Sequence, residues 1–116
     1  MKTIKIVPSV CSELESKWSG HVTLKPLSFD DRYELFENLS IGFNDDGDVD
    51  LAKTDRIKTM RKMVKASEKL YVEVDLKHTD GTEVKSFEEM QYIDDLHPVL
   101  VEVATKMING FKVGNG

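Results

Sequence analysis

Residues 70–77 read LYVEVDLK, and they mark the point at which the chain changes from a helical to an extended pattern. Every second side chain is apolar, and the set consists of Leu70, Val72, Val74 and Leu76. A period of two places such side chains on one face of a β-strand, so we expect all of them to point the same way. Asp80-Gly81 follows as a favoured tight turn, because glycine tolerates positive φ. The pattern therefore predicts a β-hairpin over residues 71–85.

The segment before this hairpin predicts a long helix from about Leu51 to Tyr71. Its apolar side chains fall on one arc about 140° wide when each residue turns by about 100°. They are Ile57, Met60, Met63, Val64, Leu70 and Tyr71. The opposite arc is basic and consists of Lys58, Arg61, Lys62, Lys65 and Lys69. This basic face is either a solvated surface, whose cations suit the C-terminal end of a helix, or a surface that binds an acidic partner.

Two N-terminal segments, 2–7 and 20–26, also alternate polar and apolar side chains and predict strands. Pro26 should end the second strand, because proline cannot donate a hydrogen bond to a β-ladder. The residues between the two strands, 12–19, are mostly polar and predict a connection that includes Trp18.

Ser28 predicts the start of the next helix, because its hydroxyl can accept a hydrogen bond from the backbone amide three residues on. Apolar side chains follow at helical intervals, and we expect this set to face the core: Phe29, Tyr33, Phe36 and Leu39. Ser86 repeats the capping pattern in the phrase SFEEM and predicts a short helix.

Pro98 marks the first turn of a last helix, where proline is well tolerated. The apolar face of this helix consists of Val99, Leu100, Val103, Met107 and Ile108. Asn109-Gly110 predicts its end. Residues 111–116 carry Phe111 and Val113 beyond this stop, and they either fold back over the core or hang free as a docking segment.

Together these elements predict an α+β fold in one domain over residues 1–116. We expect a small antiparallel sheet, made of the N-terminal strands and the 71–85 hairpin, to pack with three to four helices. No apolar run approaches the roughly 20 residues that a membrane-spanning helix needs. The single Cys11 cannot form an internal disulfide, and no secretory signal is recognisable, so we expect a cytosolic protein.

The charge of the chain is unevenly distributed. Residues 53–69 hold seven basic and two acidic residues, a net charge of +5, so the remainder carries −10 within the total of −5. The acidic total argues against nucleic-acid binding, and the basic face lacks the interleaved aromatic side chains on which bases usually stack. We therefore expect neither a nucleic acid nor a membrane as a partner.

The sequence contains no motif for a cofactor, a metal ion or a catalytic centre. If Gly47 took the sixth position of a calcium-binding loop, the twelfth would be Lys53, which cannot replace the bidentate glutamate. One cysteine and three scattered histidines do not make a zinc motif. A small enzyme whose site joins Cys11 with His21 or His97 remains an alternative.

Residues 18–29 read WSGHVTLKPLSF and lead into Asp31-Arg32, and residues 96–115 form a proline-led apolar segment that ends in NGFKVGN. Residues 86–90, SFEEM, precede an acidic stretch. These phrases resemble those of the tail assembly chaperones of long-tailed bacteriophages, in which a short strand ending in Lys/Arg-Pro-Leu-Thr/Ser-Phe leads into the first helix. The resemblance touches both ends of the chain and about a third of its residues, and it leaves out the basic helix and the hairpin.

The resemblance implies a non-catalytic protein of the host-cell cytoplasm that is absent from the mature virion. Such a protein binds the tape measure protein, keeps it soluble and helps recruit tail tube protein. Our hypothesis is that residues of the tail, the last helix and the basic face contribute to self-association or partner binding. They are Phe111, Val113, Met107, Lys58, Arg61, Lys62 and Lys65. The alternative is an acidic inhibitor or immunity-type protein that binds and blocks a basic enzyme.

Overall fold

The predicted hairpin forms one edge of a β-sheet. A computed structural model describes residues 2–39, 45 and 56–109 of the chain. In it, strand β3 (Tyr71–His78) pairs antiparallel with the short strand β4 (Glu83–Val84). Gly81 in the connecting turn has a φ of +99°, a backbone angle that residues other than glycine rarely adopt. The turn therefore forms where the sequence predicts it.

Two N-terminal strands complete the sheet. β2 (Trp18–Leu24) pairs with β3, and β1 (Ile4–Ile6) pairs with the outer side of β2. The strand order in the described part of the chain is β1-β2-β3-β4, and every pair is antiparallel. The predicted α+β class with a small antiparallel sheet is therefore confirmed.

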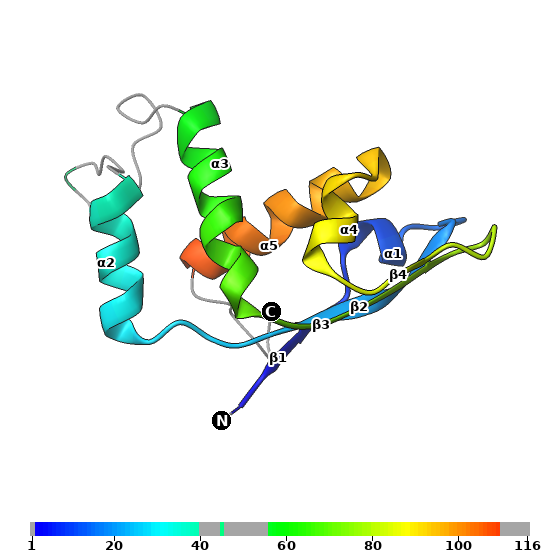
Figure 1. Cartoon of the computed structure of the whole chain (residues 1–116), viewed down its shortest axis with the longest axis horizontal. Coiled ribbons are helices and arrows are strands. Elements are labelled where there is room, and N and C mark those ends of the chain that lie inside the picture. Colours follow the sequence, from blue (N-terminus) through cyan, green and yellow to red (C-terminus); the bar gives the residue numbers. More distant parts are fainter. Residues whose placement is uncertain (1, 40–44, 46–55, 110–116) are drawn as a thin grey trace.

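The described residues form five α-helices, and Figure 1 shows them on one side of the sheet. They are α1 (Ser9–Ser12), α2 (Phe29–Leu39), α3 (Arg56–Ser67), α4 (Phe87–Gln91) and α5 (His97–Asn109). Four of them correspond to the predicted helices, and the single turn α1 is additional. The predicted helix over 51–71 is too long at its C-terminal end, because a 3₁₀ turn over Glu68–Leu70 follows α3 and Tyr71 already belongs to β3.

Both predicted helix caps are present. The Ser28 hydroxyl accepts a hydrogen bond from the Asp31 amide at 3.1 Å, and the Ser86 hydroxyl accepts one from the Glu89 amide at 3.1 Å. Each bond satisfies a backbone donor that has no partner within the helix, which sets the point where α2 and α4 begin.

The core lies between the sheet and the helices. Helix α5 contributes most to it, and its buried side chains are Val99, Leu100, Val103, Ala104, Met107 and Ile108. The sheet contributes the buried side chains Ile6, Trp18, Val22, Leu24, Val74, Leu76 and Val84. The predicted apolar face of the last helix is therefore confirmed.

Trp18 is part of this core, and its prediction as a connecting residue is wrong. Its side chain is buried, and the indole Nε1–H donates a hydrogen bond to Asp95 Oδ2 at 3.3 Å. The edge of the ring meets His78, with the ring centroids 4.8 Å apart. Because Asp95 lies just before α5, Trp18 connects the start of β2 to the helix layer.

Val72 departs from the predicted alternation. Thr23 pairs with Glu73 whereas Leu24 pairs with Tyr71, so β3 carries one extra residue, Val72, at this point. Such a bulge turns the side chain out of the regular pattern. Val72 is accordingly 53% exposed and does not share a face with the buried Val74.

The face of the sheet away from the helices is polar. Lys85 Nζ lies 2.7 Å from Asp75 Oδ1, and His21 Nε2 lies 3.0 Å from Glu73 Oε1. The hydrogen bond from Lys85 holds the pKa of Asp75 below its ordinary value. One face of an antiparallel sheet commonly remains in contact with solvent in this way.

Gly20 permits a close approach between the backbones of β2 and β3. Its φ is +122°, and a Cβ placed there would overlap the backbone carbonyl oxygen of Asp75. Gly81 also has positive φ, but a Cβ there would meet nothing within 4 Å. A substitution at Gly81 therefore introduces backbone strain alone, whereas a substitution at Gly20 introduces backbone strain together with a steric clash.

We predict that Gly20→Ala lowers the free energy of unfolding by more than about 3 kcal/mol, because it adds a clash with backbone atoms to the strain of positive φ. Gly81→Ala serves as the matched control and should cost only about 1 kcal/mol. Urea unfolding followed by circular dichroism measures both. Equal losses for the two variants would contradict the close approach at Gly20.

Candidate protein-binding surface

Helix α2 carries an aromatic stripe, defined here as Phe29, Tyr33 and Phe36. The Phe29 and Tyr33 ring centroids are 4.6 Å apart, and those of Tyr33 and Phe36 are 5.5 Å apart. Phe29 is 78% exposed and Tyr33 is 50% exposed. The prediction that these two side chains face the core is therefore wrong, and of the Leu39 side chain the structure describes nothing.

The reason is the orientation of α2. Its opposite side, with Asp31, Leu35 and Asn38, lines a polar groove shared with α3, which we call the α2/α3 groove. At about 100° per residue, the aromatic stripe lies about half a turn away from these residues and so points away from α3. The helical spacing of the aromatic residues was predicted correctly. The predicted direction is wrong for Phe29 and Tyr33, whereas Phe36 is half-buried and packs against the core.

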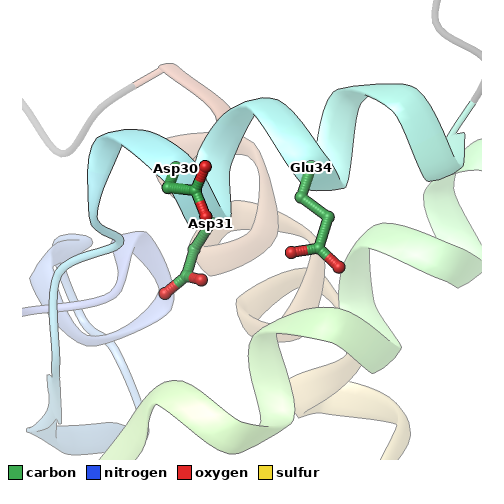
Figure 2. A group of neighbouring side chains, drawn as sticks. All are labelled: Asp30, Asp31 and Glu34. Carbon is green, nitrogen blue, oxygen red and sulfur yellow. The ribbon is translucent and has the colours of Figure 1, made fainter.

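Charge complementarity characterises the α2/α3 groove. Asp31 and Glu34 line it from α2, opposite the α3 residues Lys62 and Lys65. Figure 2 shows these two carboxylates, together with Asp30, along α2. The three exposed carboxylates offer oxygen atoms within 4.8 Å of one another. Their place in the first turns of a helix favours negative charge, and the nearby lysines favour it further, so these two effects account for the acidic cluster.

Arg32 adds a specific contact between α2 and α5. Its guanidinium donates a hydrogen bond to the backbone carbonyl of Ile108, close to the C-terminal end of α5. The same guanidinium lies 5.6 Å from the centre of the Phe36 ring. The cation therefore meets a helix C-terminus, where positive charge is favourable, and helps to hold α2 in place.

A second groove runs between α3 and α5, and we call it the α3/α5 groove. Its apolar lining consists of Ile57, Met60 and Val64 from α3 and of Leu100 and Val101 from α5. Its basic lining consists of Arg56, Lys58, Arg61, Lys62 and Lys65, all from α3. Ile57 is 78% exposed although it lies on the predicted apolar arc, because its place in the first turn of α3 leaves it at the rim of the groove.

The structure brings the predicted basic residues to this groove. Lys58, Arg61, Lys62 and Lys65 are exposed on α3, and all four line the α3/α5 groove. Lys62 and Lys65 also line the α2/α3 groove. The basic face is thus divided between two grooves, one with an apolar floor and one in which carboxylates of α2 lie opposite the lysines of α3.

The other predicted contact residues are not at this surface. Met107 is 1% exposed and belongs to the core, so it is not accessible to a partner. Phe111 and Val113 lie outside the described residues. Periodicity does not single out Val101, which is 38% exposed at the groove, because this residue adjoins the apolar face of the last helix and no local signal separates the two.

The enzymatic alternative rests on Cys11, His21 and His97, and none of these residues belongs to the aromatic stripe on α2. Burial raises the pKa of the Cys11 thiol, and the nearby Glu102 carboxylate raises it further. A nucleophilic cysteine needs the opposite shift, because the thiolate is the reactive form. His97 Nε2 lies 2.7 Å from the Gln91 carbonyl oxygen, and His21 contacts Glu73 on the polar face of the sheet.

Comparisons of this chain with protein-family models, with curated proteins and with solved structures find no match. Among the described residues, none of the helices has the length and apolar character needed to cross a membrane. The resemblance carried by residues 18–29 and 96–115 therefore stays a prediction.

We predict that Ile57→Ala changes the free energy of unfolding by less than about 0.5 kcal/mol, because the side chain already contacts solvent. Met63→Ala, on the same helix, should cost about 2–5 kcal/mol, because Met63 is buried in the core. Urea unfolding of both variants provides the measurement. A large loss for Ile57→Ala would place this side chain in the core and remove it from the groove.

Proposed function

We propose that this chain is a non-catalytic tail assembly chaperone that binds the tape measure protein and keeps it soluble. In this role it helps to recruit tail tube protein during assembly in the host-cell cytoplasm. The observation that carries the proposal is the α3/α5 groove, where apolar side chains of two helices lie at the surface beside a row of cations. The sequence phrases at 18–29 and 96–115 support the same class of protein.

The physical requirements of this role are modest. A tape measure protein is a very long amphipathic helix, and its apolar face would aggregate if it were left bare. A chaperone needs only apolar area of suitable shape to cover that face reversibly. Many copies along one client also gain from avidity, so that each single contact can be weak.

The alternative function, inhibition of a basic enzyme, requires a different surface charge. A protein that blocks a basic enzyme would be expected to present acidic side chains around its apolar contact area. Here the charged side chains that line the α3/α5 groove in the described part of the chain are mostly basic, with Glu68 as the acidic one. Gene neighbourhood provides a simple discrimination, since a tape measure reading frame downstream favours the chaperone and an adjacent nuclease or toxin favours the inhibitor.

The direct test is co-expression with the tape measure protein encoded beside this chain, followed by size-exclusion chromatography with light scattering. We predict that the tape measure protein stays in the soluble fraction and co-elutes only when this chain is present. Ile57→Ser should reduce co-elution, and Leu14→Ser should not, because Leu14 is even more exposed than Ile57 but lies outside the groove.

A truncation after Asn109, with its fold verified by circular dichroism, determines in the same assay whether Phe111 and Val113 contribute. Unchanged co-elution of the truncated chain would remove these two residues from the proposal. A tape measure protein that is equally soluble without this chain would refute the proposed function as a whole.

A further inference from the structure

The α3/α5 groove has the layout of a site for one helix. Ile57, Met60 and Val64 follow one another along one side of α3 at intervals of three and four residues. Leu100 and Val101 line the groove from α5. A groove between two helices with an apolar floor is a recurrent docking site for an amphipathic helix, which inserts side chains of the same spacing.

The charges of this groove lie on one side. All five cations among the described residues of the lining belong to α3, and α5 contributes His97 beside the apolar residues. Among the described residues of the lining, Glu68 in the turn after α3 is the acidic one. These residues carry a formal charge of +4 with histidine counted as neutral, whereas the whole chain carries −5. A positive margin on a negatively charged protein selects the sign of the partner that approaches it.

We propose that the α3/α5 groove binds a single amphipathic helix whose apolar stripe is flanked by glutamate or aspartate on the side that meets α3. This inference rests on the proposed function, because it names the chemistry of the helical segment that the chaperone covers. The apolar stripe contacts Met60, Val64 and Leu100. The acidic flank contacts Arg61 and Lys65.

A second copy of this chain is the competing occupant, because α2 also presents exposed aromatic side chains beside acidic ones. However, Asp31 and Glu34 of α2 already face the lysines of α3 within the same chain. Their charge is therefore partly balanced, which makes α2 a weaker acidic ligand than a helix from another protein. Light scattering of the chain alone separates the two occupants.

The test uses two fluorescein-labelled synthetic helical peptides with identical leucine stripes, one flanked by glutamates and the other by lysines. Fluorescence anisotropy measures their binding to the full chain. We expect the glutamate peptide to bind at least roughly tenfold more tightly than the lysine peptide, because several exposed ion pairs at the rim are replaced by like-charge contacts. The difference should shrink when the salt concentration is raised from about 0.05 M to about 0.5 M.

Two charge-reversal variants test whether the peptide binds in the α3/α5 groove. Arg61→Glu should weaken binding of the glutamate peptide roughly fivefold and improve binding of the lysine peptide, because it reverses one rim charge. Lys69→Glu is the matched control, since Lys69 lines the α2/α3 groove and makes the same change in net charge. It should leave both affinities within about twofold, because an exposed charge outside the site is largely screened.

Equal binding of the two peptides, no binding of either, or equal effects of Arg61→Glu and Lys69→Glu would each overturn the inference. It is also overturned if the chain alone forms oligomers that Arg61→Glu disperses, because the occupant is then a second copy. The peptide assay does not involve the tape measure protein. Solubilisation of that protein without peptide binding would therefore remove this inference alone, and the reverse result would remove the proposed function alone.

Discussion

The pairing of β2 with β3 is the interaction on which the rest of the structure depends. Helices α2 and α3 lie in the connection between these strands, so the pairing joins segments far apart in the sequence at a cost in loop entropy. Burial of Val22, Leu24, Val74 and Leu76 offsets this cost, at about 1.5–3 kcal/mol for each side chain. Gly20 allows the approach, because any side chain there would overlap the backbone of Asp75.

The same pairing determines which helices enter the core. α5 places six buried side chains between the sheet and the other helices, and α3 lies against α5. Figure 1 shows α2 farther from the sheet, beside α3. α2 is held by the hydrogen bond from Arg32 to Ile108 and by the packing of Leu35 and Phe36 against the core. Phe29 and Tyr33 remain exposed, because α5 and α3, and not α2, cover the sheet.

Surface charge and surface apolarity have separate roles in the proposed function. The apolar floor of the α3/α5 groove supplies area to be removed from water, which is the general source of affinity. The lysines and Arg61 beside it mainly influence the rate of encounter and the choice of partner. Lys62 and Lys65 line both grooves, so the same two cations lie opposite the carboxylates of α2 and beside an apolar site.

The sequence by itself determined the α+β class, the hairpin, both helix caps and the buried face of the last helix, because each depends on a local period or a bond within a few residues. Only the tertiary structure decided that Phe29 and Tyr33 point outward, that Val72 leaves the strand pattern and that Met107 is inaccessible. It also created the candidate groove, since Val64 and Leu100 come from two helices that are far apart in the sequence and pack against each other only in the fold. Periodicity identifies an apolar face, but whether that face meets the core or solvent depends on which other helix has already covered the sheet.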